Sequence, residues 1–524
     1  MRDDDTELLD LPLIPRPQRG EVHGGGRALA AVLSDLVEVP QPGVAPEGYH
    51  VEVRGGRATV RAADARGFRY ARVTLDELAR LHDGQVPDIA IDDAPVLARR
   101  GIIEGFYGEP WSHAERLAAV AFAGRLKLNS YVYAPKDDPF HRERWREPYP
   151  SEDLTRLVDL AEEGAKHGVD VVVALHPAGS MVFADDAEHE LLASKARQLL
   201  DAGIPDVALL FDDVPPTPVH ERDKARFGED DAALGEAHAL TIRRFQDAVG
   251  SHLSDGHLLV VPMDYAGTAA SEYRTAFAAG LPDSVLVWWT GADIVVGEIT
   301  RQDIDAAAEV FGDRLLLWDN FPVNDFDRGR AFLGPLLGRT TEVAGSVLHG
   351  AWSNPMVEYV PGGFGIASFA DWAWNPAGYV AARSAKAALQ VVAGPRADAL
   401  APLVRTLSSW PPSAPMDQSL ADAADRALES ASNAAELRMR LEQWRALADV
   451  DTSAEPARSL EPWLRAAVDM AAAGLIALDL HEGHAGSTAT DTAAALARAE
   501  AHKAKVGVDV IPEFVRQVLK RSSV

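Results

Sequence analysis

Eight short apolar runs, separated by stretches with helical periodicity, restrict the fold of this 524-residue chain more than any other feature. Buried strands that alternate with amphipathic helices are typical of parallel βα units, and eight such units over about 250 residues match a (β/α)8 barrel. The sequence therefore predicts an α/β protein with a TIM barrel. The runs are Gly101–Ile103, Ser130–Tyr133, Val169–Leu175, Val207–Phe211, His257–Val261, Ser284–Trp288, Arg314–Leu317 and Val343–Leu348.

A doubly wound open sheet is the competing architecture for the same alternation. That fold places a glycine-rich phosphate loop directly after its first strand. The residues after the first run, Glu104-Gly105-Phe106-Tyr107-Gly108, do not have that pattern. The barrel is therefore the preferred interpretation.

The chain on either side of the barrel has a different character. Residues 1–95 predict a small α/β accessory domain, with strands at Tyr49–Val53 and Ala58–Ala62 and helices at Ala28–Val37 and Gly67–Leu81. The barrel is expected over residues 96–370. Residues 371–524, rich in Ala, Leu, Arg and Glu, predict a helical bundle with a break at 411–415 and helices at Ser419–Leu447, Leu460–Leu480 and Thr490–Lys505.

Composition excludes several classes of function. The formal charge of −28 argues against general nucleic-acid binding and against attraction to anionic membranes. The absence of cysteine excludes disulfides, thiolate metal sites and cysteine nucleophiles. The acidic start Met1–Asp5 has no apolar signal segment, and no apolar run approaches the roughly 20 residues of a membrane span. We expect a cytoplasmic protein, with secretion left open because a trimmed N-terminus would look the same.

Two adjacent carboxylates, Asp212 and Asp213, follow the fourth apolar run directly and are followed by Val214-Pro215-Pro216. In a barrel this is the carboxyl end of a strand, the face on which active sites are built. Neighbouring carboxylates repel each other, so one is expected to hold its proton near neutral pH while the other stays charged, which suits acid/base chemistry. The alternative for an isolated pair is an ordinary surface turn.

Other polar and aromatic residues fall at the ends of further runs, and together they suit a sugar. Amides, carboxylates and a lysine can bind hydroxyl groups, and aromatic rings can cover an apolar sugar face. Taken singly, each residue has an ordinary structural explanation. Besides the Asp pair, the residues expected at one pocket are Lys136, Tyr265, Trp318, Asn320, Asp325 and Asn354.

Other barrel chemistries fit less well. A metal-dependent hydrolase would carry a His-x-His near the first strand, where Ile103–Phe106 offers no imidazole. His481-Glu482-Gly483-His484 lacks the spacing that puts two histidines on one helical face. A Schiff base on Lys136 would leave the Asp pair without a purpose.

Several of these segments resemble the motifs of family 84 glycoside hydrolases, the β-N-acetylglucosaminidases that include protein O-GlcNAcases. The opening block Arg100–Ser112, the second block Asn129–Asp138 and the seventh-strand block Trp318–Asp325 are long and specific. Phe211-Asp212-Asp213 resembles the catalytic pair, and Ser353–Met356 completes the set. The resemblance covers roughly residues 5 to 370.

The resemblance implies retaining exo-hydrolysis of terminal β-linked GlcNAc, in which the 2-acetamido group of the substrate attacks and forms an oxazoline. Asp212 would then bind the acetamido N–H, and Asp213 would act as general acid and base. Tyr265 would contact the acetamido group and Trp318 would cover its methyl. Contacts to the sugar hydroxyls would come from Gly101 (through its backbone), Lys136, Asn320, Asp325 and Asn354.

The implied partner is a GlcNAc-containing glycoside or glycoprotein, and the resemblance implies neither a metal nor an organic cofactor. The same mechanism acting on glycan or cell-wall fragments is one alternative, and a non-catalytic sugar-binding barrel is another. For the C-terminal helices, the alternatives are a bundle packed on the barrel and a surface that forms a homodimer.

Overall fold

The computed structural model contains a closed barrel of eight parallel strands, in the order β10-β11-β12-β13-β14-β15-β16-β9. The structure describes residues 6–7, 11–414, 417–484 and 486–522, so Met1–Asp5 and Pro415 of the predicted segments lie outside the described residues. The predicted TIM barrel is confirmed. Its strands are β9 (Arg99–Glu104), β10 (Ser130–Tyr133), β11 (Asp170–Leu175), β12 (Asp206–Leu210), β13 (Leu258–Val261), β14 (Val285–Trp289), β15 (Leu315–Asp319) and β16 (Leu348–Ser353).

The predicted position of the eighth strand, Val343–Leu348, was wrong, because the observed strand is Leu348–Ser353 and shares only Leu348 with it. Val343 to Val347 is apolar, but Gly345 has a φ of +73° and the Ser346 N–H donates to the Val343 carbonyl, so the chain turns there. The strand begins only at Leu348 and pairs with β15 as far as Asp319 opposite Ser353. Asn354 therefore comes directly after the strand.

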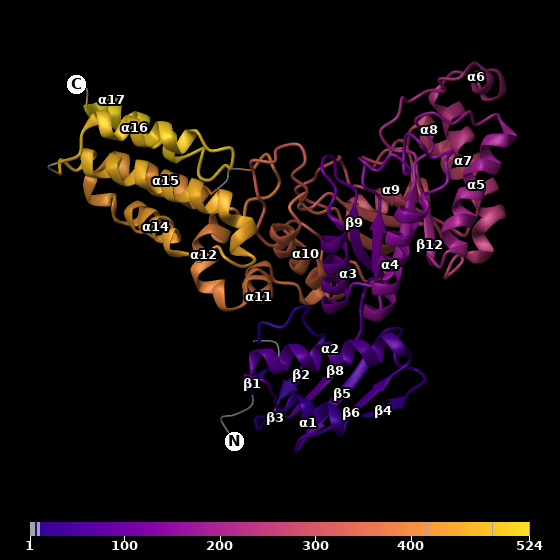
Figure 1. Ribbon diagram of the computed structural model, residues 1–524, viewed down its shortest axis with the longest axis horizontal. Coiled ribbons are helices and arrows are strands. Elements are labelled where there is room, and N and C mark those ends of the chain that lie inside the picture. Colours follow the sequence, from indigo (N-terminus) through magenta and orange to yellow (C-terminus); the bar gives the residue numbers. More distant parts are fainter. Residues whose placement is uncertain (1–5, 8–10, 415–416, 485, 523–524) are drawn as a thin grey trace. The chain divides into compact units, whose positions relative to one another are not determined.

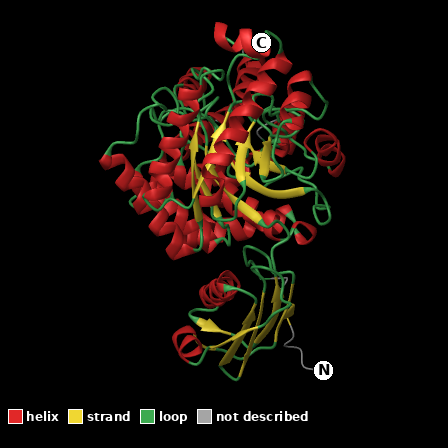
Figure 2. Ribbon diagram, turned by 90° about the vertical axis from the view of Figure 1, so that its right-hand side faces the viewer, coloured by secondary structure: helices red, strands yellow, loops and turns green. Residues whose placement is uncertain are grey.

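Helices surround the barrel strands, as Figures 1 and 2 show. The first, α3 (His113–Arg125), begins with a capping box in which Ser112 and Glu115 bond each other's backbone N–H, and α4 (Ser151–His167) ends at Gly168 in the left-handed conformation. The remaining helices between strands are α5 (Asp186–Asp201), α6 (Glu221–Phe227), α7 (Asp231–Val249), α8 (Glu272–Ala279) and α9 (Arg301–Phe311), and α10 (Tyr359–Trp374) follows β16.

Tryptophans fill much of the barrel interior. The rings of Trp288 and Trp318 meet edge to face at 5.9 Å, and those of Trp288 and Trp352 at 5.2 Å. Small residues make room for them, because a Cβ on Gly101 would lie 2.3 Å from the Trp352 ring and one on Gly105 would lie 2.4 Å from Trp318. The interior is therefore a packed core.

The N-terminal part forms a six-stranded sheet in the order β1-β2-β8-β5-β6-β4. The predicted hairpin is confirmed as β5 (Tyr49–Arg54) and β6 (Arg57–Ala62), joined by Gly55 and Gly56 with φ of +56° and +78°. The predicted Gly67–Leu81 helix is α2 (Ala65–Leu81). Ala28–Val37 was predicted as one helix, but only α1 (Leu29–Ser34) is helical, and Val37 begins strand β4 (Val37–Pro40). The other strands are β1 (Thr6–Glu7), β2 (Arg19–Val22) and β8 (Ile89–Asp93), and β3 (Arg27–Ala28) pairs with β7 (Gln85–Val86).

A buried polar cluster joins this sheet to the barrel. The Lys127 ammonium lies 3.0 Å from the Asp93 carboxylate and 2.7 Å from the Tyr49 hydroxyl, and Trp374 Nε1 donates to Asp93 at 2.8 Å. The Arg100 guanidinium, fully buried, pairs with Glu47 at 2.6 Å. Because a buried charge without its partner is costly, these pairs fix how the two parts meet.

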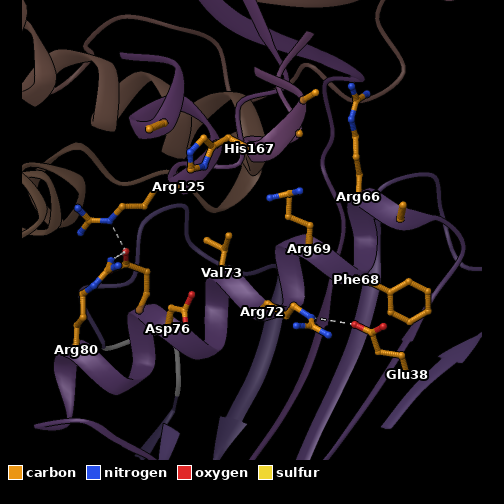
Figure 3. A pocket seen from close by; sticks show the side chains of 16 residues that line it. Glu38, Arg66, Phe68, Arg69, Arg72, Val73, Asp76, Arg80, Arg125 and His167 are labelled. Atoms are coloured by element: carbon orange, nitrogen blue, oxygen red, sulfur yellow. Dashed lines mark hydrogen bonds and ion pairs between the residues drawn. The ribbon is translucent and has the colours of Figure 1, made fainter. Parts of the chain in front are cut away.

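Beside this cluster, a groove of about 860 Å³ runs between α2 and the helices α3 and α4. Figure 3 shows the arginines that line it, with Arg72 reaching Glu38. Arg125 Nε donates to Glu77 at 2.7 Å, and Arg80 pairs with the same carboxylate. Most of its charges are thus paired with one another.

Contacts divide the chain into two units. The first contains Met1–Phe321, Gly338–Pro355 and Ile366–Val380, and the second contains Pro322–Leu337, Met356–Gly365 and Ala381–Val524. The accessory sheet therefore belongs to the same unit as the barrel strands. The domain limits 95/96 and 370/371 stay predictions.

Helices make up most of the second unit. The helix predicted over Ser419–Leu447 is two helices, because Ser430 leaves helical geometry with φ −158° and its side chain caps a 3-10 turn, Ala431–Asn433. None of the helices among the described residues combines the length and the apolar character needed to cross a membrane. The described α-helices that lie wholly in the second unit are α11 (Ala381–Ala393), α12 (Ala397–Thr406), α13 (Gln418–Glu429), α14 (Ala435–Arg445), α15 (Ala457–His481), α16 (Ala489–Glu500) and α17 (Ile511–Ser522).

Candidate active site

The Asp pair lies just beyond the carboxyl end of β12. Phe211 extends the ladder by donating its N–H to the Val261 carbonyl at 2.9 Å, and Asp212 and Asp213 follow. The side chain of Asp212 is 7% exposed, whereas that of Asp213 is 31% exposed. Asp213 also adopts a left-handed backbone with φ +56°, which few non-glycine residues do. The two carboxyl groups therefore have different surroundings.

Lys136 is the partner of Asp212. Its buried ammonium bonds Asp212 Oδ2 directly and lies 3.9 Å from Asp213 Oδ2. Burial would raise the pKa of Asp212, but the positive charge of Lys136 outweighs burial and holds that pKa well below 3.8. Asp212 is thus an anion at neutral pH. Its other oxygen, Oδ1, is buried and accepts no hydrogen bond from another residue in the described part of the chain.

Two tyrosines donate to Asp213. Tyr265 reaches Oδ1 at 3.0 Å, and the half-exposed Tyr107 reaches Oδ2. Burial and the Asp213 carboxylate raise the pKa of both phenols, which keeps them protonated as donors. Arg142 lies over the Tyr107 ring with 5.8 Å between its guanidinium carbon and the ring centroid.

Amide groups from β15 and β16 form a second hydrogen-bonded set. Asn320 Oδ1 accepts from Trp318 Nε1 at 2.9 Å and from Asn354 Nδ2 at 2.8 Å. Asn354 Oδ1 in turn accepts from the Gly105 N–H at 3.3 Å. The Lys136 ammonium lies 6.0 Å from the centroid of the Trp318 ring and so connects this set with the Asp pair.

The structure therefore brings together most of the residues expected at the site: Asp212, Asp213, Lys136, Tyr265, Trp318, Asn320 and Asn354. Gly101 does not join them. It lies inside β9, opposite Ser130 at the start of β10 and against the Trp352 ring, three residues before the end of its strand. Gly105, in the same motif, supplies the backbone N–H at the strand end. Asp325 belongs to the second unit, half-buried in the loop after β15, and its contact with a sugar stays a prediction.

Three residues at the site were absent from the predicted set. Tyr107 and Gly105 lie within the Arg100–Ser112 block, and attention to every residue after the first strand would have found them. His176 follows the third strand directly, and its Nε2 lies 2.7 Å from the Asp212 carbonyl oxygen. A single histidine after an apolar run does not by itself indicate that the residue belongs to the site.

One group of described residues has donor atoms close enough to hold a metal, namely Asp479, Glu482 and His484. It lies in the second unit, and Arg438 pairs with both carboxylates at 2.8 Å. These acids are already neutralised by a cation of the protein itself.

Comparison with known proteins agrees with this geometry. The family model described as beta-N-acetylglucosaminidase matches residues 100–405, and the model for domain 2 of glycosyl hydrolase family 20 matches residues 17–94. The protein O-GlcNAcases of Rattus norvegicus and Mus musculus are each 31% identical over 278 residues, which are 52% of this chain and 29% of theirs. The chain therefore spans less than a third of the length of these relatives.

Solved structures of similar fold include CpGH84B, with a TM-score of 0.86 and 22% identity over 97% of this chain and 99% of that one. A mutant O-GlcNAc hydrolase of Thermobaculum terrenum has a TM-score of 0.74 and 26% identity over 81% of this chain and 95% of that one. The family match covers more than half of the sequence, including every barrel strand but the first residue of β9. The chain therefore belongs to the beta-N-acetylglucosaminidase family that this model describes.

Proposed function

We propose that this protein removes terminal β-linked GlcNAc from a glycoside or glycoprotein, with retention of configuration, and that the substrate's acetamido group is the nucleophile. One observation carries the proposal. Asp212 is buried and anionic, with Oδ2 bound by Lys136 and with Oδ1 buried and accepting from no other described residue. A buried carboxylate oxygen that lacks a donor is costly, and an amide N–H satisfies it.

In the first step, the acetamido oxygen attacks the anomeric carbon and the bond to the leaving oxygen breaks. Asp212 accepts the acetamido N–H and stabilises the positive charge that develops on the amide. Asp213, more exposed and next in the chain, gives its proton to the leaving oxygen. The product of this step is a bicyclic oxazoline that keeps its N–H proton and is therefore a cation paired with the Asp212 carboxylate, so the enzyme forms no covalent bond with the sugar.

In the second step, Asp213 takes a proton from water, which attacks the anomeric carbon from the side that the leaving group vacated. The bond to the acetamido oxygen breaks and the acetamido group is restored. Two inversions give net retention. Tyr107 and Tyr265 donate to Asp213 in the structure and would keep its carboxylate oriented between the two proton transfers.

The test uses aryl N-acetyl-β-glucosaminides. Asp213→Asn should lower kcat/KM, which reports the first step, by on the order of 10²-fold or more on a poor leaving group and by much less on 2,4-dinitrophenolate, which leaves without a proton. Asp212→Asn should lower kcat/KM by a similar factor on both substrates, because it acts on the acetamido group. Equal rescue of both variants would contradict this division of roles.

Two further measurements test the nucleophile. The matched aryl glucoside, which lacks the acetamido group, should not be hydrolysed. Replacing the acetyl hydrogens stepwise by fluorine should lower kcat with each substitution, because the amide oxygen becomes a poorer nucleophile. A rate that does not change across this series would rule out participation by the acetamido group, and proton NMR of the first-formed anomer would test retention.

A further inference from the structure

His176 is the first residue after β11, and its ring contacts the backbone of the Asp pair. The residue is 2% exposed, and its backbone N–H donates to the His141 carbonyl at 2.9 Å. Burial lowers the pKa of its imidazole, so the ring is neutral at pH 7. Nothing in the proposed mechanism so far uses this histidine.

Its Nε2 lies 2.7 Å from the backbone carbonyl oxygen of Asp212. A carbonyl oxygen can only accept, so the proton of the neutral ring is on Nε2. The same nitrogen is 3.5 Å from Asp212 Oδ1. The N–H therefore points at the peptide that joins Asp212 to Asp213 and also faces the Asp212 carboxylate.

That peptide controls where Asp213 points. Asp213 has φ +56°, a conformation that costs energy for a residue with a Cβ and persists only where its surroundings hold it. In this conformation its carboxyl group meets Tyr107 on one oxygen and Tyr265 on the other. If the backbone of Asp213 changed to the ordinary right-handed region of φ and ψ, its carboxyl group would move away from both tyrosines.

We infer that His176 is a positioning residue, which holds the Asp212–Asp213 peptide by its Nε2–H so that the Asp213 carboxyl group faces the leaving oxygen. The inference deepens the proposed function and rests on the role of Asp213 in it. On the other side of the strand, the ring of His238 stacks on Phe211 at 4.3 Å, but its Nδ1 pairs with the Tyr273 hydroxyl. His176 is thus the histidine that contacts the pair itself.

The variants separate positioning from simple loss of a buried side chain. His176→Leu removes the donor, and His176→Gln keeps an N–H at about the same reach. His189→Leu is the matched control, because His189 is also buried and also bonds a backbone carbonyl, that of Phe183, through Nε2 at 2.8 Å. Tm is measured for all three, so that a folding defect is recognised.

We expect His176→Leu to lower kcat/KM by on the order of 10- to 100-fold on a poor leaving group, as small displacements of catalytic groups do. The loss should be several-fold smaller on the 2,4-dinitrophenyl substrate, KM should change little, and His176→Gln should recover most of the activity. His189→Leu should not alter the ratio of the two rates. Equal losses on both leaving groups, or a Gln variant as slow as the Leu variant, would overturn the inference.

Two readouts are independent of turnover and so distinguish this inference from failure of the proposed function. Nitrogen NMR of 15N-histidine-labelled protein should show the proton of His176 on Nε2. A crystal structure of His176→Leu should show Asp213 outside the left-handed region and no longer bonded to Tyr107 and Tyr265. A proton on Nδ1, or an Asp213 that has not moved, would overturn the positioning role even in an active enzyme.

Discussion

A carboxylate lies at or near each end of strand β12, and the protein shifts the pKa values of the two in opposite directions. Asp206, its first residue, accepts from the Ser254 backbone N–H at 2.8 Å and from its hydroxyl at 2.6 Å. Burial, with added repulsion from Asp170 and Asp255, raises its pKa to about 6. Asp212, two residues beyond the other end, is more deeply buried, and yet its pKa lies well below 3.8.

A single cation accounts for the difference. The Lys136 ammonium bonds Asp212 directly, whereas Asp206 has hydrogen bonds from a neutral serine. Burial by itself makes a carboxyl group a weaker acid, and a buried positive charge reverses that effect. The carboxyl end of β12 is therefore followed by a fixed anion, and its amino end holds a group whose charge depends on pH. This agrees with the separation of chemistry and stability between the two faces of such barrels.

The largest expected difference between the two ends is in catalysis. Asp212→Asn should lower kcat on an aryl N-acetyl-β-glucosaminide by on the order of 10²-fold or more, because the charge opposite the developing cation is lost. Asp206→Asn, at the opposite end of the same strand, should keep kcat within about twofold. Steady-state kinetics on both variants measures the contrast, and a comparable loss in the two would remove the functional distinction between the faces.

Removing the Lys136 ammonium should raise the pKa of Asp212, as burial raises the pKa of Asp206. Lys136→Met leaves a buried carboxylate without its partner and should lower the free energy of unfolding by about 3 kcal/mol at pH 7. In the wild type, the low pKa of Asp212 adds stability that is complete above pH 3.8 and declines as the pH falls below it. In the variant, burial would instead raise that pKa, so the deficit should shrink as the pH falls and Asp212 takes up a proton.

Urea unfolding of wild type and Lys136→Met at pH 7 and pH 4.5 measures this deficit. Lys127→Met is a useful second variant, since it removes another buried ammonium that pairs with a carboxylate, Asp93, away from the site. It should destabilise the protein but leave kcat nearly unchanged. A pH-independent deficit in Lys136→Met would mean that Asp212 stays charged without its cation.

Replacing Asp206 should change the free energy of unfolding by less than replacing Lys136 does, and in the opposite direction. Because its pKa of about 6 is above the value of 3.8 for an exposed carboxyl, the native state is favoured below pH 4 and loses that advantage as the pH rises through 6. Asp206→Asn should therefore raise the free energy of unfolding by about 1–2 kcal/mol at pH 8 and by almost nothing at pH 4, allowing for partial exposure of the site. Thermal unfolding across this range measures it, and a stabilisation that is the same at both pH values would refute the titration.

The smallest effect concerns the serine that supports Asp206. Ser254→Ala removes the hydroxyl donor, which helps to hold the pKa of Asp206 down. We expect a loss of about 1 kcal/mol at pH 8 and a pH dependence of stability that shifts upward. The double variant Asp206→Asn, Ser254→Ala serves as the control, because without the carboxylate no such shift should remain.

The strand count was predictable because parallel strands covered on both faces are continuously apolar, and turns or polar residues separate them. The position of the eighth strand was predicted wrongly, because the apolar run Val343–Val347 includes Gly345 and turns, whereas the true strand Leu348–Ser353 contains His349 and Gly350. The long Ser419–Leu447 helix failed for a related reason. Its periodicity continues across Ser430, whose side chain bonds the backbone and ends the helix.

Within the site, residues at strand ends could be predicted and contacts could not. Asp212, Lys136 and Asn354 come from β12, β10 and β16, and a barrel necessarily brings such positions together. Gly101 was chosen from the correct motif but lies four residues too early, inside the strand. Tyr107 lies in the Arg100–Ser112 motif and could have been found there, whereas His176 could not be identified, because a histidine after a strand acquires its role only from what lies opposite it.

Taken alone, the sequence determined the barrel, the position of the Asp pair at a strand end, and the family, since these depend on local periodicity and contiguous motifs. The tertiary structure decided which carboxylate is the anion and which atoms remain without a donor. It did so because these properties depend on neighbours such as the Lys136 ammonium and the neutral His176 ring, which are 76 and 36 residues from Asp212 in the chain and come within hydrogen-bonding distance only when the barrel closes.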